Sequence, residues 1–360
     1  MLRAIDRSLG TLHQVSTSTS SSQALELAAH LNPDLAILDI RMPELDGFTL
    51  MHALKAQHPD IDVVLMTGSV DDHDEKLVRA LRGAAFYFIQ KPFDRDVLRA
   101  LVERCVELRR QRQENRRHLL RLEGEVAAAR AFQQSLLPAL EASYGGIRIV
   151  CHQTSSSELG GDLYDHAAVG GAPGVSALLL ADVAGHGAIA AMLTGVVKSA
   201  FRAAERDRYA PVAVVERLLL ALAPFGAERF VTLIAATITA GEHCIRYVNA
   251  GHPAGCLWDG SGRLDRLDST GPLVSPALPD SLWTEATLPL RAGDRLLLYT
   301  DGVLDGLSRD EDQDRRLLSA IERCPQGGRQ LIEALVAEIR QHAGGHATDD
   351  DVTLLTVVVD

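Results

Sequence analysis

Residues 177–187 read ALLLADVAGHG, an apolar run that ends in an aspartate and a glycine-rich turn. Residues 296–302, LLLYTDG, repeat the arrangement. Short apolar runs bounded by turn residues predict buried strands. Asp182 and Asp301 are therefore each expected at the end of a strand.

Two further aspartates have comparable settings. Asp162 follows two glycines in GGDLYD, and Asp350 precedes the apolar run in TDDDVTLL. One aspartate at a strand end is usually a turn or cap residue, but four in such settings predict a shared acidic pocket. Neighbouring carboxylates raise one another's pKa, and two divalent cations would relieve that repulsion. Oxygen ligands favour Mg²⁺ or Mn²⁺ over zinc, and paired ions of this kind suit phosphoester hydrolysis.

The chain from residue 138 to 360 surrounds these aspartates with runs of strands and helices. Strands are expected at 147–153, 175–183, 229–239, 244–251, 294–302 and 351–359, and helices at 190–205, 211–225 and 327–342. Because the elements come in runs and do not alternate strictly, an α+β fold is predicted.

The motif set GGDLYD, ADVAGHG, NAGHP, GDRLLLYTDG and DDVTLL resembles the SpoIIE-type branch of the protein phosphatase 2C serine/threonine phosphatases, over about residues 131–360. The resemblance implies a β-sandwich domain of the α+β class that uses two Mn²⁺ or Mg²⁺ ions. It also implies metal-ligand roles by position. Asp182 would bridge both ions and the Val183 carbonyl would add an oxygen; Asp301 and Asp350 would complete one ion, Asp162 would serve the other directly or through water, and Asp351 is the uncertain neighbour of Asp350.

Histidines near this site have two interpretations. His186, between two glycines, could protonate the leaving serine oxygen, but such a histidine is more often a hydrogen-bonded structural residue. The same alternatives hold for His252, whereas Asn249 is expected to be structural. A diguanylate cyclase also carries a Gly-Gly-acid hairpin. That alternative ranks low because Leu163 and Tyr164 replace its Glu-Phe pair, and because it leaves the other aspartates unexplained.

Residues 1–97 alternate short apolar strands, at 35–38, 62–66 and 85–89, with amphipathic helices, at 21–31, 48–58 and 74–83. Alternation of this kind predicts a parallel α/β sheet. Asp39, Thr67 and Lys91 directly follow or end the three strands. Ligands and chemistry collect at that edge of an open α/β sheet.

The stretches LAILDIRMPELDGFTL, VVLMTGS and FYFIQKPF resemble the receiver domain of response regulators, a flavodoxin-like fold. The resemblance implies that Asp39 is the phosphoacceptor, Thr67 the switch hydroxyl and Lys91 the lysine that contacts the phosphate. It also implies a histidine kinase or phosphotransfer protein as the phosphate source.

The family's first strand, which ends in an acidic pair that holds Mg²⁺, has no counterpart here. The chain opens at what corresponds to the first helix, and residues 13–20 are expected to form the second strand. A truncated or misassigned start is the favoured explanation; a degenerate receiver, or another segment in the gap, are the alternatives. The receiver's own Mg²⁺ is therefore not expected to be bound in the usual way.

A basic segment, residues 98–137 with net charge +4, separates acidic blocks of −5 and −11. Mostly apolar positions recur there with 3,4 spacing for over five heptads, with the polar Arg112, Asn115 and Gln133 among them. This predicts a long linker helix and a parallel coiled-coil homodimer. A helix that packs back on its own domains is the alternative. The seam positions are Leu98, Leu101, Cys105, Leu108, Arg112, Asn115, Leu119, Leu122, Val126, Ala129, Gln133 and Leu136.

The overall net charge of −12 argues against general nucleic-acid binding, and no apolar run is long enough to cross a bilayer. The five cysteines show no paired spacing, which favours reduced thiols in a cytoplasmic protein. We expect a receiver-regulated protein phosphatase whose substrate, by family resemblance, is an anti-sigma-factor antagonist. The alternative is a catalytically silent phosphoprotein-binding scaffold with a phosphate-independent receiver.

Overall fold

The computed structural model describes residues 1–360 except 69–86, 171–173, 309–311, 344–347 and 349. The chain divides by its internal contacts into two compact units, Met1–Leu122 and Glu123–Asp360, and each is described by itself. This division, at Leu122, falls inside the predicted linker, so the predicted boundaries at 97 and 137 stay a prediction. Among the described helices, none combines the length and the apolar character that a membrane span requires.

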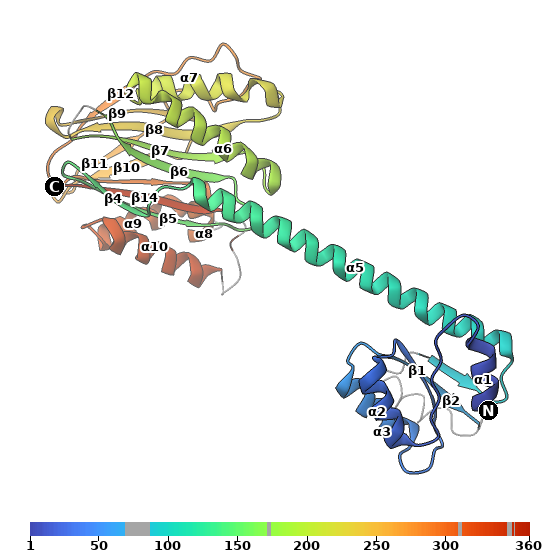
Figure 1. The fold of residues 1–360 in the computed structure, drawn as a ribbon. Helices are drawn as coiled ribbons and strands as arrows, with labels where there is room; N and C mark the ends of the chain where they lie inside the picture. The colour runs from blue at the N-terminus through green and yellow to red at the C-terminus, as the bar shows by residue number, and fades with distance from the viewer. Residues whose placement is uncertain (69–86, 171–173, 309–311, 344–347, 349) are drawn as a thin grey trace. The chain divides into compact units, whose positions relative to one another are not determined.

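The first unit is a parallel α/β sheet of order β1-β2-β3 with helices on both faces, as predicted (Figure 1). Its elements are α1 (Leu2–Leu9), α2 (Ser21–Leu31), β1 (Leu35–Asp39), α3 (Gly47–Gln57), β2 (Asp62–Thr67), β3 (Tyr87–Gln90) and the start of α5 (Arg95–Leu136). The predicted helix at 74–83 lies outside the described residues.

Strand β2 shows why the helices divide between the two faces. Val63 and Leu65 pack with α2 and α3, whereas Val64 and Met66 pack with α1 and α5. Because successive side chains of a strand point to opposite faces, a continuous apolar run can bury both. This is the expected pattern for a strand in the middle of a covered parallel sheet.

The predicted strand at residues 13–20 is wrong. No residue of that segment is in a strand, although the helix before it (α1) and the helix after it (α2) both form. In the described sheet β1 is an edge strand whose ladder partner is β2. A segment that should pair with a strand absent from this sheet has no backbone partners there, so it remains irregular.

Helix α5 is one continuous helix of 42 residues, which confirms the predicted linker helix. Its first turns belong to the core of the first unit, where Leu98, Val102 and Cys105 are buried against the sheet. Further along, the guanidinium of Arg112 donates to both carboxylate oxygens of the buried Asp62, at 3.0 and 2.8 Å. The first part of the predicted seam therefore contacts residues of its own chain, in the first unit.

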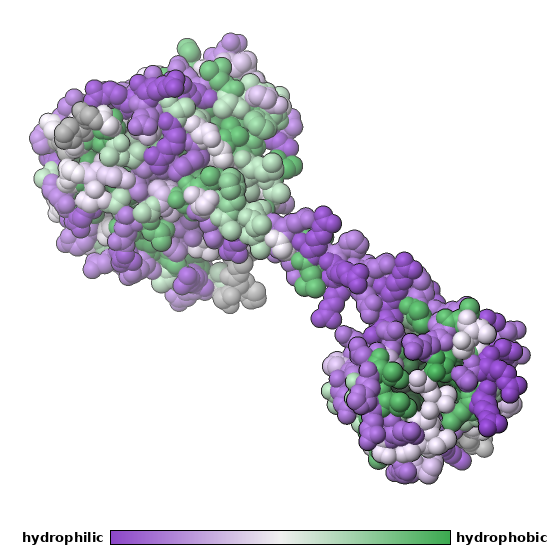
Figure 2. Space-filling view, in the orientation of Figure 1, coloured by the Kyte–Doolittle hydropathy of each residue, from purple (hydrophilic) through white to green (hydrophobic). Residues whose placement is uncertain are grey.

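The middle of α5 has the opposite character. Leu119 and Leu122 are exposed, and Figure 2 shows the surrounding helix surface as mainly hydrophilic (Figure 2). Near its end the helix is again in contact with its own chain, through Gln133. The alternative of a helix that packs on its own domains thus holds at both ends of α5, and the coiled coil stays a prediction for the exposed middle.

The second unit is an α+β sandwich of two antiparallel sheets, of order β11-β10-β13-β14-β5-β4 and β12-β9-β8-β7-β6. Its strands are β4 (Glu141–Tyr144), β5 (Ile147–Thr154), β6 (Asp162–Ala168), β7 (Val175–Val183), β8 (Val231–Thr239), β9 (Cys244–Ala250), β10 (Gly255–Trp258), β11 (Leu264–Leu267), β12 (Ala286–Pro289), β13 (Arg295–Tyr299) and β14 (Val352–Val359). Its α-helices are α6 (Ala188–Ala203), α7 (Pro211–Leu222), α8 (Asp301–Leu307), α9 (Gln313–Arg323) and α10 (Gly328–His342). Short 3₁₀ helices are η1 (Ala204–Asp207), η2 (Ala223–Phe225) and η3 (Ala240–Glu242).

The sheets stack face to face, with helices on both outer sides (Figure 1). Leu178 and Leu180 of β7 point into the core between the sheets, while Leu179 and Ala181 pack under α6 and α7. The run ALLLADV is apolar without alternation because both faces of its sheet are covered. All six predicted strands and all three predicted helices of this unit form. Strands β4, β6, β10, β11 and β12 and helices α8 and α9 were not predicted.

Candidate functional site

The predicted aspartates gather at one end of the sandwich, where strands of both sheets begin or end. In the five-stranded sheet, Asp162 opens β6 and lies directly opposite Asp182, near the end of β7. In the six-stranded sheet, β13 ends just before Asp301, and Asp350 and Asp351 immediately precede β14. Because β13 and β14 are antiparallel neighbours, the end of one and the start of the other lie at the same edge.

The electrostatics confirm that these carboxylates lie close enough to repel one another. Burial raises the pKa of Asp182 to about 7, with further contributions from the charges of Asp301, Asp350 and Asp351. Burial also raises the pKa of Asp162 well above its usual value, and Asp182 adds to that effect. The pKa of Asp301 is raised by burial and then by Asp350.

Asp162 is held from the opposite sheet. Its Oδ2 accepts hydrogen bonds from the hydroxyls of Thr300, at 2.8 Å, and Thr353, at 2.5 Å. Both threonines are fully buried. The sequence analysis missed them because a threonine after or within an apolar strand carries no signal of its distant partner.

Asp351 has a different environment from Asp350. Its Oδ1 accepts hydrogen bonds from the backbone N–H and hydroxyl of Ser156, at 2.8 and 3.1 Å, and its Oδ2 accepts one from the N–H of Gly161 at 2.7 Å. Asp351 therefore ties the loop that precedes Asp162 to the start of β14. Asp350 is exposed, and its Oδ1 accepts a hydrogen bond from the Asp351 N–H. These contacts favour Asp350 over Asp351 as a metal ligand.

Two glycines allow the backbone segments of the site to approach. A Cβ on Gly161 would lie 2.7 Å from the carbonyl oxygen of Val183, the backbone oxygen predicted to bind metal. A Cβ on Gly302 would lie 2.0 Å from the carbonyl oxygen of Asp351. Real Cβ atoms essentially never make such contacts, so only glycine permits these approaches.

The donor set fits hard divalent cations in its chemistry, because it consists of carboxylate and carbonyl oxygens with mutually raised pKa values. Within the described residues, no three acidic, histidine or cysteine side chains stand in an arrangement that could hold a metal ion. Among the described residues, the carboxylates are thus neighbours at one end of the sandwich, but no three of them surround a common position.

The two predicted histidines lie in different environments. His186 is exposed on the glycine-rich turn after β7, and its catalytic role stays a prediction. His252 is buried. Its Nδ1 lies 2.9 Å from the Thr232 hydroxyl, its backbone N–H donates to Asn249 Oδ1 at 2.8 Å, and burial lowers its pKa to about 3. Asn249 also donates to the carbonyls of His252 and Leu267, at 3.0 and 2.9 Å, so its contacts are those of a structural residue.

In the first unit, the three predicted residues also meet at one edge. Lys91 forms an ion pair with Asp39, and its N–H donates to the Thr67 carbonyl at 2.7 Å. The Lys91–Pro92 peptide is cis. Both ionic side chains keep about a fifth of their surface exposed, 22% for Lys91 and 20% for Asp39, so the carboxylate is accessible to solvent.

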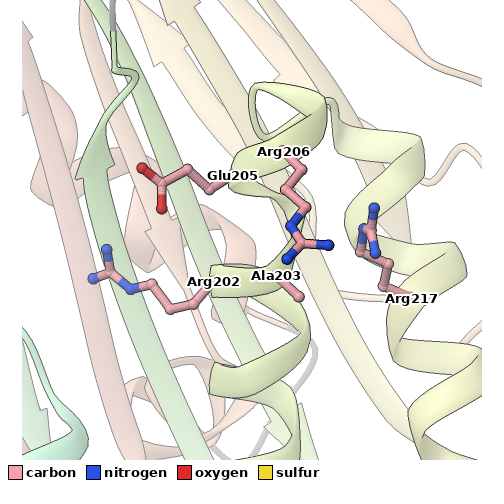
Figure 3. Close-up of a pocket in the computed structure, with 5 residues that line it drawn as sticks. All are labelled: Arg202, Ala203, Glu205, Arg206 and Arg217. Atoms are coloured by element: carbon pink, nitrogen blue, oxygen red, sulfur yellow. The ribbon is translucent and has the colours of Figure 1, made fainter.

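A recess of about 510 Å³ lies away from the acidic edge, lined by Arg202, Ala203, Glu205, Arg206 and Arg217 (Figure 3). Arg206 and Arg217 extend toward one another from η1 and α7, while Arg202 points toward β6. Arg202 is paired with the buried Asp165, and Arg217 with Asp207. Most of the positive charge is thus already neutralised, and the recess contains none of the predicted site residues.

Comparisons with known proteins agree with this architecture. The family model for stage II sporulation protein E (SpoIIE) matches residues 172–360, and that for the response regulator receiver domain matches residues 1–103. The receiver is 39% identical over 93 residues to the regulatory protein AtoC of Escherichia coli, covering 26% of this chain and 20% of that protein. It is 43% identical over 84 residues to the transport regulator DctD of Pseudomonas aeruginosa, covering 23% and 18%. The chain thus spans about a fifth of the length of these curated relatives.

Solved structures share the fold of the second unit. The SiaA-PP2C domain of Pseudomonas aeruginosa superposes with a TM-score of 0.59 at 19% identity, over 68% of this chain and 98% of that one. The RsbU and RsbW domains of Rv1364c from Mycobacterium tuberculosis give 0.53 at 21% identity, over 61% and 62%. The PP2C phosphatase domain of SpoIIE from Bacillus subtilis, solved with a fragment of its regulatory domain, gives 0.52 at 16%, over 62% and 65%. With a family match over more than half of its length, the chain belongs to the SpoIIE family, and it joins a SpoIIE domain, which has the fold of PP2C phosphatase domains, to a receiver domain.

Proposed function

We propose that this protein is a metal-dependent protein serine/threonine phosphatase whose activity is controlled by its receiver domain. The observation that carries the proposal is the meeting of Asp162, Asp182, Asp301 and Asp350 at one end of the sandwich. Burial and neighbouring carboxylates raise the pKa values of Asp162, Asp182 and Asp301. A cluster of carboxylates is unfavourable without cations. Membership of the SpoIIE family supports phosphoester hydrolysis as the reaction that the bound cations would serve.

Two Mn²⁺ or Mg²⁺ ions at this edge would activate water and neutralise phosphoryl charge. We propose that Asp182, Asp162, Asp301, Asp350 and the Val183 carbonyl hold them, while Asp351 keeps the Gly161 loop in place. His186, exposed on the adjoining turn, would deliver a proton to the leaving serine or threonine oxygen.

The contacts of α5 support regulation through this helix. In the receiver, Arg112 pairs with Asp62, and Arg109 donates to Asp34 at 2.9 Å. In the phosphatase unit, the side-chain amide of Gln133 donates to the Gly160 carbonyl at 2.7 Å, beside the loop that Asp351 holds. One continuous helix therefore contacts both the receiver and the segment that leads into Asp162, so a change at one contact can bias the other.

The direct test is hydrolysis of a phosphoserine or phosphothreonine peptide with Mn²⁺ and with EDTA. We expect turnover that requires the metal and that is lost when Asp182 is replaced by Asn. A protein that binds the phosphopeptide equally with and without Mn²⁺, and releases no phosphate, would instead be a scaffold.

Asp39→Ala is expected to abolish the change in turnover that a small phosphodonor, such as acetyl phosphate, produces in the wild type. The substitution removes the carboxylate that would accept the phosphoryl group next to Lys91, and basal Mn²⁺-dependent turnover should persist. Glu26→Ala, an exposed acidic residue on α2, is the control and should respond like the wild type. Equal responses of wild type and Asp39→Ala would contradict the assignment.

We also propose that the exposed middle of α5 forms a homodimer with a second copy. Leu119→Lys and Leu122→Lys are expected to convert the dimer into a monomer, because a charge in a coiled-coil seam is unfavourable. Leu120→Lys is a matched control, since Leu120 is as exposed as Leu119 (60%) but lies outside the seam. Sedimentation analysis measures the outcome, and a wild type that sediments as a monomer would rule the dimer out.

The partners follow from the two domains. We propose a phosphorylated anti-sigma-factor antagonist as substrate, on the strength of SpoIIE family membership, and a histidine kinase or phosphotransfer protein as the phosphate source for Asp39. Incubation with a panel of phosphorylated proteins would identify the substrate as the one that is dephosphorylated fastest.

A further inference from the structure

Two buried hydroxyls approach the same atom of Asp162 from the other sheet. Asp162 opens β6 in the five-stranded sheet, whereas Thr300 directly follows β13 and Thr353 lies in β14 of the six-stranded sheet. Asp162 is 2% exposed, and both threonines are fully buried. These three residues therefore form a polar link between the two halves of the proposed site.

The Thr300 hydroxyl both accepts and donates within this link. The backbone N–H of Thr353 donates to the Thr300 hydroxyl oxygen at 3.1 Å, so that oxygen already accepts one proton. Its own proton can go to Asp162 Oδ2 at 2.8 Å or to the more distant Asp351 carbonyl at 3.4 Å. The Thr353 hydroxyl donates to the same Oδ2 at 2.5 Å.

Both hydroxyls thus donate to the same carboxylate oxygen, Oδ2 of Asp162. In the part of the chain that the structure describes, the other oxygen, Oδ1, makes no hydrogen bond. Hydrogen bonds to a charged acceptor are stronger than neutral ones, and two of them from rigid β-branched side chains leave the carboxylate little rotational freedom. Asp162 also lies opposite Asp182 across the β6–β7 ladder.

We propose that Thr300 and Thr353 are positioning residues of the metal centre: their hydroxyls hold Oδ2 and thereby present Oδ1 alone to a divalent cation. This inference rests on the proposed function, because it assigns Asp162 to the cation. It differs from a purely structural role, in which the hydroxyls would only satisfy a buried carboxylate and metal affinity would not depend on them.

The first experiment measures Mn²⁺ affinity of the full-length protein by calorimetry or electron paramagnetic resonance. Thr353→Val, which removes the hydroxyl but keeps the shape, is expected to weaken binding about tenfold, as residues that orient metal ligands typically do. Thr353→Ser keeps the hydroxyl and should restore affinity to within about threefold of the wild type, since the loss is attributed to that group alone.

Thr356→Val is the matched control for this measurement. Thr356 is equally buried on the same strand, but its hydroxyl donates to the Val150 carbonyl, at 3.3 Å, away from the aspartates. Mn²⁺ affinity of Thr356→Val should equal that of the wild type. If the wild type binds Mn²⁺ and Thr353→Val binds it equally well, the inference is overturned while the proposed function stands.

A second measurement needs no metal. In EDTA, the unfolding midpoints of wild type, Thr353→Val, Asp162→Asn and the double variant form a double-mutant cycle. We expect the midpoint of the double variant to change by far less than the sum of the two single changes. Additive effects would show that the hydroxyl does not hold Asp162 and would overturn the inference. A wild type that binds no Mn²⁺ contradicts both the proposed function and the cation role, and the cycle still decides whether the hydroxyl holds Asp162.

Discussion

Asp182→Asn is expected to eliminate Mn²⁺-dependent turnover and, in the metal-free protein, to increase stability at pH 8. The two effects have one cause. Burial and the charges of Asp301, Asp350 and Asp351 raise the pKa of Asp182 from 3.8 to about 7. The same negative charge that would bind a cation therefore destabilises the fold when no cation is present.

The sign of the pH dependence follows from this shift. A carboxyl whose pKa is higher in the folded state binds more protons there than in the unfolded chain. Its favourable contribution is full below pH 3.8, the unfolded value, and is lost as the pH rises through 7. Linkage sets an upper limit of about 4 kcal/mol on this loss. Partial exposure of the side chain reduces it, so a gain of about 2 kcal/mol for the neutral asparagine at pH 8 is expected.

Unfolding in EDTA between pH 5 and 9, with and without added Mn²⁺, checks this expectation. Wild type should gain stability on addition of Mn²⁺ and Asp182→Asn should gain much less. Turnover should fall about 10³-fold or more, since metal chemistry supplies several kcal/mol of transition-state stabilisation. Asp268→Asn, whose side chain is 76% exposed, serves as the control. An Asp182→Asn protein as unstable as wild type at pH 8, and as active, would remove Asp182 from the site.

Gly302→Ala is expected to have the second largest effect, although it changes no acidic residue. The added Cβ would lie 2.0 Å from the Asp351 carbonyl oxygen and 2.9 Å from its carbonyl carbon, both backbone atoms. The first turn of α8, which begins at Asp301, and the segment before β14 must then separate. A displacement of about 1 Å at a catalytic site can cost about 10²-fold in rate, and overpacking of this kind costs about 1–3 kcal/mol of stability.

Gly306→Ala on the same helix separates these two effects. Its Cβ would lie 2.8 Å from a methyl carbon of Ile339, a side chain that packs α8 against α10. We expect Gly306→Ala to lower the melting temperature without changing Mn²⁺ affinity, whereas Gly302→Ala should weaken both. Wild-type Mn²⁺ affinity in Gly302→Ala would show that the approach of α8 to the Asp350–Asp351 segment is not needed for the site.

Several structural features of this protein can be predicted from short stretches of its sequence. Strand β7 lies between two apolar layers, so its central residues 177–181 are all apolar, and the run ALLLADV shows this directly. Helix α5 contains no proline, and its apolar spacing predicts one helix, which forms. Strands such as β6 and β12 are mixed in polarity, so no local pattern distinguishes them from loops.

Local patterns were less informative where the same spacing of residues is compatible with two different packing partners. The spacing of α5 is the same for a coiled-coil seam and for a helix packed on its own domain, and the partner decides between them. Leu98 and Cys105 pack into the receiver, and Arg112 pairs with Asp62. The segment 13–20 has the composition of a strand, yet it has no ladder to join.

The sequence by itself determined the two domain types, the helix between them and the aspartates that end or precede apolar strands, because those signals lie within a few consecutive residues. Only the tertiary structure decided which neighbours those aspartates have. Thr300 and Thr353 are 138 and 191 residues away from the carboxylate they hold, and Asp351 is 190 residues from the Gly161 N–H. Hydrogen bonds between sheets depend on how the two sheets stack, which is an outcome of burying the whole core and not of any single segment.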